Sequence, residues 1–353
     1  MRIIIFTKYN KMGPSSYYRV YQFLEKSNQK YSIDIQYFWG DYYFKYIVNK
    51  IGFQKYVFIL PGLFIGVLRR LFFLFFKLYR YDAVRIEKDF LPGFPVLFEY
   101  FIKFVLKKKI IFEFDDAVFL TNFPRNKTPK LISLSNVVIA GNNLLKQYAQ
   151  KYNSNITVIP TGVDYEQYMN IKSVRVEWSS NIVIGWIGSS SGLKYIKEIE
   201  PALFNLEKKG YKFEFRIICN EDIELKLKNK KFIKWNRDSA DIDMSYFDIG
   251  IMPLSNDEFS KYKCGFKIIQ YIAMKIAVVA SPYGINQEII NNGESGFLAE
   301  TTLEWEESLE RLLIDSELRR KLSEDAYSDT IGKFDLSRIQ LKYDEVYSRL
   351  QKS

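Results

Sequence analysis

The stretch KCGFKIIQYIAMKIAVVASPYG, residues 263–284, decides the fold class. Its first half predicts a short helix that begins directly after Gly265, and the apolar run from Ile276 to Ala280 predicts a buried strand that ends in a Ser-Pro turn. Free backbone amides at a helix start attract anions, and Lys263 and Lys267 add positive charge there. The stretch therefore predicts an α/β domain with an anion site at the start of this helix.

Helix-like and strand-like segments alternate along all 353 residues, which is enough chain for two domains with substantial cores. The pattern begins with RIIIFT and restarts with NIVIGWIGS after a polar, irregular segment. We expect an N-terminal domain over residues 1–165, a linker over 166–178, a C-terminal domain over 179–335 and a final helix over 336–353. Parallel sheets bind ligands at the carboxyl ends of their strands, so two such domains predict a ligand cleft.

Composition excludes several kinds of catalysis. The chain has no histidine, which removes histidine bases, histidine triads and histidine metal ligands. Its two cysteines, Cys219 and Cys264, are far apart and lack ligand spacing, which indicates a reducing, cytoplasmic compartment. The first residues, MRIIIFTKYN, predict a strand and lack the apolar core and cleavage site of a signal peptide.

The formal charge of +10 is concentrated between residues 41 and 110. This segment contains 13 Lys and Arg, only 5 Asp and Glu, and 20 Phe and Tyr. In LFIGVLRRLFFLFFKLYRY, residues 63–81, the four cations fall on one stripe of a helix; they are Arg69, Arg70, Lys77 and Arg80. This pattern predicts a helix that lies in a membrane interface with its basic side toward anionic headgroups. A buried core helix with a narrow exposed stripe is the main alternative, and a membrane-spanning helix or a nucleic-acid surface is less favoured.

Four segments, in order, resemble the motifs of one enzyme family: ITVIPTGVD, IVIGWIGSSSGLKYI, DIGIMPL and the segment KCGFKIIQYIAMKIAVVASPYGINQEIINNGESGFLA. They are similar to retaining GT-B glycosyltransferases of bacterial surface-polysaccharide biosynthesis, the glycosyl transferases group 1. The likeness covers roughly residues 156–299 and is weaker in the N-terminal half, where GPSSYYRV and FEFDDAV resemble loops of one subgroup. It implies two Rossmann-like domains, with the donor nucleotide on the C-terminal domain, the acceptor on the N-terminal domain and the final helix packed back on the latter.

The resemblance also implies the donor-site residues. Gly265 lets the backbone approach a diphosphate, which the amides of Phe266 and Lys267 would bind, while Lys263 and Lys267 would stabilise the leaving nucleotide as catalytic residues. Further donor contacts are expected from the loop after the first strand of this domain, from the next helix and from the base pocket; they are Gly188, Ser189, Lys194 and Trp235. Solvated lysines and a packed tryptophan are the alternatives for these side chains.

The family has two glutamates seven residues apart where this chain has Tyr262 and Gln270. Gln270 can still pair with a ribose diol through its amide, whereas Tyr262 supplies no carboxylate and leaves the donor-sugar contact open. Asp257 and Glu258 are the nearest carboxylates in sequence. A retaining mechanism in which the leaving phosphate takes the acceptor proton needs no histidine base.

On the N-terminal side, we expect acceptor contacts from Ser15, Ser16, Arg19 and Asp115, with Asp116 as a catalytic contact or base. Arg19 would reach a lipid diphosphate. The acids of FEFDDAV also fit an Asp-x-Asp metal motif of GT-A glycosyltransferases or a helix cap, but the surrounding motifs favour a site without metal. We expect no metal and no cofactor beyond the nucleotide sugar as co-substrate.

These features favour a metal-independent hexosyl- or N-acetylhexosaminyl-transferase at the inner face of the cell membrane. It would move a sugar from a nucleotide diphosphate to a lipid-linked saccharide or glycan, in cell-envelope polysaccharide or glycoprotein assembly. Its expected partners are the donor, the acceptor and an anionic membrane surface, and no nucleic acid. A non-catalytic relative that binds nucleotide sugar or glycan as a partner subunit is the alternative, because the glutamate pair is missing.

Overall fold

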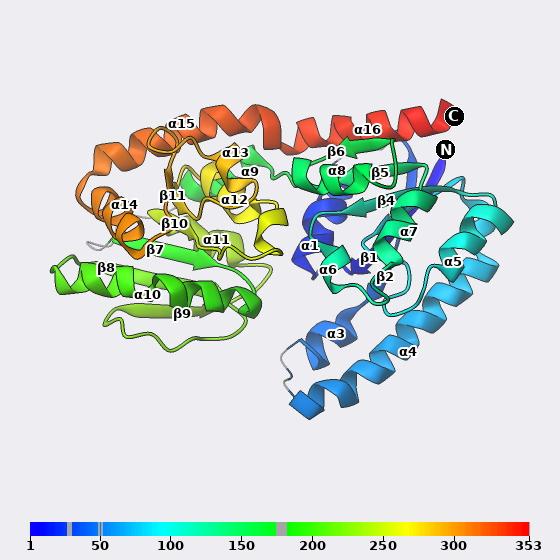
Figure 1. Ribbon diagram of the computed structural model, residues 1–353, viewed down its shortest axis with the longest axis horizontal. Helices are drawn as coiled ribbons and strands as arrows, with labels where there is room; N and C mark the ends of the chain where they lie inside the picture. The colour runs from blue at the N-terminus through cyan, green and yellow to red at the C-terminus, as the bar shows by residue number, and fades with distance from the viewer. Residues whose placement is uncertain (27–29, 49, 51, 174–181, 353) are drawn as a thin grey trace. The chain divides into compact units, whose positions relative to one another are not determined.

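The computed structural model describes residues 1–26, 30–48, 50, 52–173 and 182–352, which form two units (Figure 1). Unit 1 comprises Met1–Thr161 with Ile339–Ser353, and unit 2 comprises Gly162–Arg338. Each unit contains its own six-stranded sheet in which all neighbouring strands are parallel. The expected α/β fold class is confirmed.

The sheet of unit 1 has the order β2-β1-β3-β4-β5-β6. Its strands are β1 (Arg2–Tyr9), β2 (Ser32–Trp39), β3 (Ala83–Glu87), β4 (Lys109–Phe114), β5 (Val137–Ala140) and β6 (Ile156–Val158). Continuous apolar runs such as Ile3–Phe6 are buried, as expected for strands covered on both faces.

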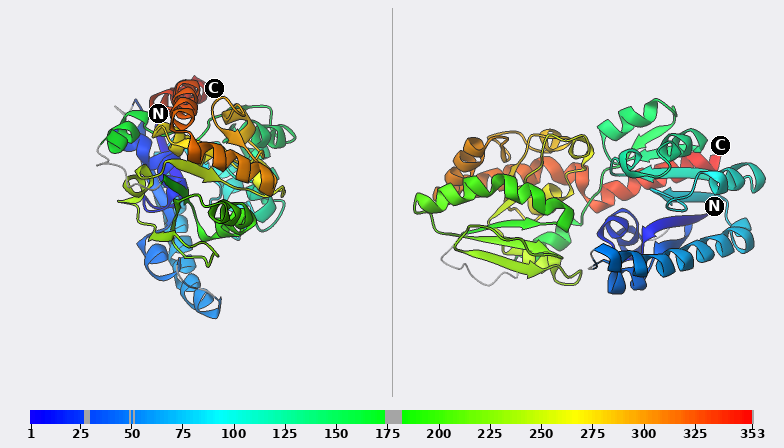
Figure 2. Two further views of the ribbon diagram at one scale, coloured as in Figure 1. Left: turned by 90° about the vertical axis from the view of Figure 1, so that its left-hand side faces the viewer. Right: turned by 60° about the horizontal axis from the view of Figure 1, so that its bottom comes forward.

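The helices of unit 1 lie on both faces of this sheet (Figures 1 and 2). They are α1 (Pro14–Ser16), η1 (Tyr17–Tyr21), α2 (Gln22–Lys26), α3 (Asp41–Tyr46), α4 (Gly52–Phe76), η2 (Leu78–Arg80), α5 (Leu97–Tyr100), η3 (Phe101–Val105), α6 (Val118–Thr121), α7 (Lys127–Leu134) and α8 (Asn143–Gln150). The last helix, α16 (Leu336–Lys352), begins in unit 2, and its residues from Ile339 onward belong to unit 1.

The sheet of unit 2 has the order β12-β11-β10-β7-β8-β9. Its strands are β7 (Ile182–Ile187), β8 (Phe213–Cys219), β9 (Lys230–Lys234), β10 (Ile249–Met252), β11 (Ala277–Ala280) and β12 (Phe297–Leu298). Its helices are α9 (Tyr165–Ser173), η4 (Ser190–Gly192), α10 (Leu193–Lys208), α11 (Ala240–Ser245), η5 (Ser260–Tyr262), α12 (Phe266–Ala273), α13 (Asn286–Ile289), α14 (Thr302–Ile314) and α15 (Ser316–Phe334). Two separate apolar clusters pack on this sheet and its helices, as in a doubly wound domain.

Helix α9 occupies residues that the sequence suggested as an irregular linker. Its first residue, Tyr165, is buried and its hydroxyl lies 2.9 Å from that of Thr330 in α15. Tyr168, one turn further, is also buried and contacts the helices of unit 2. Because most other residues of α9 are polar, the sequence did not indicate that these two tyrosines are buried. The rest of the expected linker, residues 174–178, lies outside the described residues.

Helix α4 presents the reverse of its expected orientation. Arg70 is fully buried: it donates a 2.6 Å hydrogen bond to the carbonyl of Thr7, and its guanidinium lies 4.5 Å from the ring centre of Phe6. Arg69 donates to the carbonyl of Phe38 at 2.5 Å. The prediction of a stripe of cations turned toward headgroups is therefore wrong for both arginines, which face the protein. The core-helix alternative is also wrong, because the opposite, apolar side is exposed.

Candidate functional site

The strand order of unit 2 defines where a ligand can enter. From β7 the chain proceeds through β8 and β9 on one side, and β10 to β12 lie on the other side. The loops after β7 and β10 therefore diverge, and this switch point is where open parallel sheets bind ligands. Helix α12 lies in the sequence motif of residues 263–284 and contacts β10 and β11.

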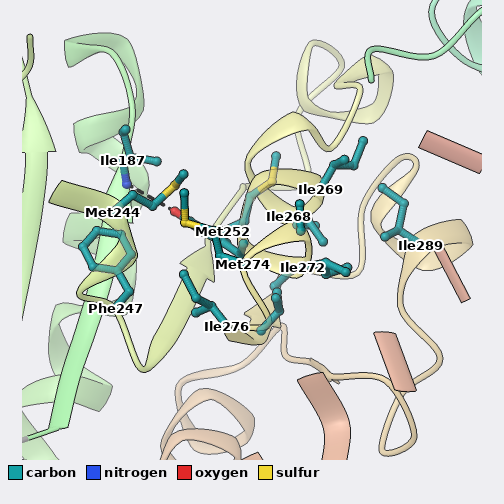
Figure 3. Close-up of a cluster of buried hydrophobic side chains, with 14 of the residues drawn as sticks. Ile187, Met244, Phe247, Met252, Ile268, Ile269, Ile272, Met274, Ile276 and Ile289 are labelled. Carbon is teal, nitrogen blue, oxygen red and sulfur yellow. Dashed lines mark hydrogen bonds between the residues drawn. The ribbon is translucent and has the colours of Figure 1, made fainter. Parts of the chain in front are cut away.

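The start of α12 is held in a fixed position. Gly265 precedes it with φ of 62°, and a Cβ atom there would lie 2.6 Å from Ile289 and 2.9 Å from Ile285. Both the left-handed conformation and the close packing require glycine at this position. Behind it, Ile268 and Ile272 are buried in the core (Figure 3). The first amides of α12 are thus presented by a rigid helix of 8 residues.

The structure brings Lys267 beside the loop that follows β7. Its ammonium nitrogen lies 5.5 Å from the ring centre of Trp186. A Cβ atom at Gly188 would overlap the ring of Trp186 and lie 3.0 Å from Cε of Lys267. Glycine at 188 therefore allows the close approach of this loop to Lys267. Residues roughly 80 positions apart, predicted separately as phosphate contacts, meet at one edge of the sheet.

The loop itself is Ser-rich and partly fixed by hydrogen bonds. The amide of Gly188 donates to the carbonyl of Ile218 at 3.0 Å. Gly188 therefore leaves room for Lys267 but does not offer its own amide to a ligand. The amide of Ser190 donates to Asn220 at 3.2 Å, and the hydroxyls of Ser189 and Ser191 lie 2.9 Å apart. The loop thus offers serine hydroxyls directly after Gly188, the position that Lys267 approaches.

Two other predicted lysines lie against aromatic rings. Lys194 is 61% exposed, and its ammonium nitrogen lies 3.4 Å from Asp257 and 4.6 Å from the ring centre of Tyr195. Lys263 lies 4.6 Å from the ring centre of Phe259. The expected role of Lys194 as a phosphate clamp stays a prediction.

Asp257 is engaged in a local network of its own. It accepts hydrogen bonds from the amide of Ser260 at 2.7 Å and from the hydroxyl of Tyr195 at 3.1 Å. Burial opposes its ionisation, but these bonds and Lys194 outweigh that effect and lower the pKa of Asp257. This carboxylate orders the segment before Tyr262.

Gln270 belongs to a buried chain of hydrogen bonds that the sequence did not reveal. Its Nε2 donates to the hydroxyl of Tyr168 at 2.8 Å, and Tyr168 donates to Asp241 at 3.1 Å. Because Tyr168 has a single proton and the carboxylate can only accept, the tyrosine oxygen accepts from the glutamine amide. A glutamate at 270 would compete with Asp241 for that proton, which gives a physical reason for the glutamine. Tyr262 and Trp235 are both half-buried, and Trp235 packs on the core of unit 2.

In unit 1, polar side chains gather where β1, β3 and β4 end. Ser15 and Ser16 donate to the two oxygens of Glu87 at 3.0 Å and 2.7 Å. The amide of Lys8 also donates to this carboxylate at 3.1 Å. Burial raises the pKa of Glu87, against the opposing effect of Lys88. Glu87 thus fixes the loop of Ser15 and Ser16 at the end of the sheet.

Lys88 connects this loop to the two predicted aspartates. Its Nζ lies 2.8 Å from Asp115, 3.1 Å from Asp116 and 3.2 Å from the hydroxyl of Ser15. Burial opposes the charge, but Asp115, Asp116 and Glu87 together raise the pKa of Lys88 well above its usual value. Lys88 adopts φ of 63°, a conformation that non-glycine residues rarely adopt. Sequence reasoning missed Glu87 and Lys88, and their position at the end of a strand pattern is the signal that could have found them.

The carboxylates of this cluster pair with the ammonium group of Lys88, which takes the place that a metal ion would need. Among the described residues, no group of three or more His, Cys, Asp and Glu side chains could hold a metal ion. The Asp-x-Asp interpretation of FEFDDAV therefore finds no geometric support in the part of the chain that the structure describes.

Arg19 is placed away from its expected role. It is 1% exposed, pairs with Glu113 through Nε and Nη2, and donates to the carbonyl of Ile159 at 2.8 Å. Arg85 pairs with the other oxygen of Glu113, and Tyr343 of α16 donates to Glu113 at 2.7 Å. The prediction that Arg19 reaches a lipid diphosphate does not fit, because its guanidinium is enclosed by the interior of unit 1.

Comparisons with known proteins agree with this architecture. The chain is similar to the structure of Anabaena Alr3699/HepE in complex with UDP and glucose, at 16% identity and a TM-score of 0.72, over 99% of this chain and 100% of that one. It is also similar to a glycosyltransferase from Rickettsia africae, at 20% identity and a TM-score of 0.71, over 100% and 99% of the two chains. Sucrose-phosphate synthase from Thermosynechococcus elongatus gives 12% identity and a TM-score of 0.68, over 100% and 99%. No curated protein matches the sequence.

Two six-stranded parallel sheets with these neighbours define the GT-B glycosyltransferase fold. Residues 210–329 match the model of the family described as glycosyl transferases group 1. This match agrees with the resemblance inferred from the motifs.

Proposed function

We propose that the chain is a retaining glycosyltransferase that moves a hexosyl or N-acetylhexosaminyl group from a nucleotide diphosphate sugar to a lipid-linked saccharide or glycan. The meeting of Lys267, the β7 loop and the start of α12 carries this proposal. These groups supply positive charge and amide donors at the switch point of unit 2, as a diphosphate requires. Structures similar to this chain contain UDP or UDP-glucose, which fits such a donor.

The proposed mechanism uses the residues of unit 2 to stabilise a leaving group. The α12 amides and Lys267 hold the diphosphate, and the charge that develops on its oxygen as the glycosidic bond breaks is stabilised there. A phosphate oxygen of the leaving group takes the proton of the acceptor hydroxyl, which attacks the same face of the sugar. This route needs no histidine and no metal.

The proposed acceptor site is the cluster at the ends of β1, β3 and β4. Ser15, Lys88 and Asp116 are held together there, and Asp116 is 32% exposed as a side chain. Hydroxyl and carboxylate oxygens of this kind bind sugar hydroxyls. Lys88 positions Asp115 and Asp116, so we assign Asp116 to binding and orienting the acceptor hydroxyl.

We place the enzyme at the cytoplasmic face of the cell membrane, in cell-envelope polysaccharide or glycoprotein assembly. The exposed apolar side of α4 supports this location, because a lipid-linked acceptor must be reached at a bilayer.

Donor turnover tests the proposal. The protein is incubated with a panel of nucleotide sugars, and release of nucleoside diphosphate is followed with and without EDTA and with a crude lipid-linked acceptor. Release from one donor that EDTA does not reduce is the expected result. Donor release that requires a divalent cation would contradict the metal-independent mechanism.

Replacing Lys267 by Met tests the residue that carries the proposal. We expect the free energy of donor binding to weaken by about 1–3 kcal/mol, because a charge-assisted contact to the diphosphate is lost. Lys231→Met, on the exposed part of β9, is the matched control and leaves affinity unchanged. Equal affinities of the Lys267 variant and the wild type, measured by calorimetry with nucleoside diphosphate, would remove Lys267 from the site.

A non-catalytic binding subunit is the second candidate, because Tyr262 and Gln270 replace the two family carboxylates. It predicts nucleotide binding without turnover of any donor, even with acceptor present. That outcome in the donor panel would favour it.

A further inference from the structure

Helix α4 exposes an unbroken apolar face. Seven large side chains on its outer side are each 50–64% exposed: Leu60, Phe64, Ile65, Leu68, Phe72, Phe75 and Phe76. Residues 57–76 are long and apolar enough to cross a membrane by length and composition. Globular surfaces rarely leave so many large apolar side chains together in water.

The inner side of α4 is docked on unit 1 and fixes which face is presented. A Cβ atom at Gly66 would lie 2.9 Å from the ring of Phe38, and one at Gly62 would lie 3.1 Å from Trp39, so the helix rests closely on β2. Arg70 completes the contact through the carbonyl of Thr7. Because this side is committed to the protein, α4 lies along unit 1 and cannot span a bilayer in this arrangement.

A second element extends the apolar surface. Helices α5 and η3 expose Leu97, Tyr100, Phe104 and Val105, each by 44–64%. The ring of Phe101 lies 5.6 Å from that of Phe75, and Lys108 donates to the carbonyl of Tyr79 at 3.0 Å. These contacts join η3 and the residues after it to the end of α4 and to η2. We call the exposed side chains of the two elements, together with Tyr79, the α4–η3 apolar surface.

Charge at the edge of this surface indicates its partner. Lys77 and Arg80 are exposed at the end of α4, and Lys107 is exposed at the end of η3. Residues 57–81 contain no Asp or Glu. An apolar centre with cations at its rim complements an anionic headgroup layer above acyl chains. A second copy that presented this same surface would bring the same cations, with no Asp or Glu from residues 57–81 to oppose them.

We propose that the α4–η3 apolar surface inserts into the headgroup and acyl boundary of an anionic bilayer, with aromatic and aliphatic side chains supplying most of the binding. The inference rests on the proposed function in that it names how this glycosyltransferase would reach a lipid-linked acceptor. Because apolar burial is not screened by salt, binding persists at high ionic strength, and the rim cations select anionic lipid.

Vesicle binding of substituted proteins tests this inference. Phe64, Leu68 and Phe72 are replaced together by Gln in what we call the outer-face variant. Its co-sedimentation is measured with phosphatidylcholine vesicles, with and without phosphatidylglycerol. We expect affinity to fall by about 100-fold or more in low and in high salt. The matched control replaces Leu303, Ile314 and Leu341 by Gln, which are 56–66% exposed elsewhere, and retains wild-type binding.

A rim variant separates charge from insertion. Replacing Lys77, Arg80 and Lys107 by Gln is expected to weaken binding to anionic vesicles by roughly fivefold per charge in low salt, with little effect in high salt. Binding that depends only on the rim, or that the outer-face variant leaves intact, would overturn the inference. A dimer would overturn it as well, if the wild type dimerises with rising concentration in ultracentrifugation, the outer-face variant does not, and neither protein binds vesicles. The surface would then join two copies of the chain.

Donor turnover keeps this inference separate from the proposed function. The outer-face variant should release nucleoside diphosphate from soluble donor at the wild-type rate, since α4 belongs to unit 1 and donor residues belong to unit 2. Vesicle binding without donor turnover by the wild type would refute the proposed function alone. Turnover without vesicle binding would refute the insertion alone.

Discussion

Glu99 is a residue whose environment differs from its sequence context. Four residues before Lys103, it suggests a surface pair on a helix. In the structure Glu99 is fully buried, its nearest cation is Lys127 at 4.0 Å, and Lys103 instead donates to Asn136 at 2.6 Å. Burial raises the pKa of Glu99 to about 7, although Lys127 opposes the shift.

Replacing Glu99 by Gln should stabilise the protein at neutral and higher pH. The folded state holds the Glu99 proton up to a pKa of about 7, whereas the unfolded chain releases it near its ordinary 4.5. The free energy of unfolding of the wild type therefore falls as pH rises through this window, and the loss is complete above it. Gln carries no such loss, so its advantage should reach about 2–3 kcal/mol above the window and vanish below it.

Urea unfolding at about pH 4 and about pH 8 measures the effect of the Glu99 variant. Glu294→Gln, at an exposed position, is the control and should change stability equally at both pH values. A Glu99 variant that gains no stability relative to wild type on raising the pH would show that Glu99 is ionised in the folded protein.

Candidate site residues were predictable where a motif constrains the backbone. Gly265 and Lys267 could be assigned because a glycine directly before an apolar helix marks a close approach of the backbone, and the lysine that follows lies beside the first amides of that helix. Glu87 and Lys88 could not, because their partners Ser15 and Asp116 are far away in sequence and meet only through the parallel register of β1, β3 and β4. The burial of Arg19 was missed for the same reason, since Glu113 is its counterion.

At the scale of elements, the sequence predicted most strands and helices but not their orientation. Apolar periodicity locates α4, yet two faces of different chemistry are available, and charge alone suggested that the arginines face water. Arg70 is buried instead, where its guanidinium lies on the ring of Phe6 and donates a hydrogen bond to the carbonyl of Thr7. Burial lowers the pKa of Arg70 to about 9, which still leaves it charged at neutral pH. Such contacts come from β1, far away in sequence, and periodicity contains no information about them.

The close docking of α4 predicts a cost for a single methyl group. Gly66→Ala places Cβ 2.9 Å from the Phe38 ring, so the ring or the helix must move. We expect the free energy of unfolding to fall by about 1–3 kcal/mol despite the better helix propensity of Ala. Gly332→Ala in α15 is the matched control, since no atom lies within 4 Å of its added Cβ, and it should gain up to about 1 kcal/mol. Chemical denaturation that ranks both variants above wild type would contradict the docking of α4.

At the scale of the whole molecule, α16 is the element that ties distant parts of the chain together. It follows unit 2 in sequence, but its buried Tyr343 and Tyr347 belong to unit 1. Arg85 donates to the hydroxyl of Tyr347 at 2.8 Å and lies 4.1 Å from the ring centre of Tyr343. Two α/β halves were predictable from the restart of the strand pattern. The contacts of the last helix were not, because its amphipathic pattern fits any apolar surface.

Replacing Tyr343 by Ala should therefore destabilise unit 1 and spare unit 2. The variant loses a fully buried ring and leaves Glu113 without one of its donors, which we expect to cost about 3–5 kcal/mol. Hydrogen exchange followed by mass spectrometry resolves the two units: amides of β1, β3 and β4 should exchange faster, whereas those of β7, β10 and β11 should keep wild-type protection. Leu341→Ala, two residues away in α16 and 56% exposed, is the control and should change neither set. Equal acceleration in both units would show that the two units unfold together. The α16 residues of unit 1 would then not stabilise unit 1 independently of unit 2.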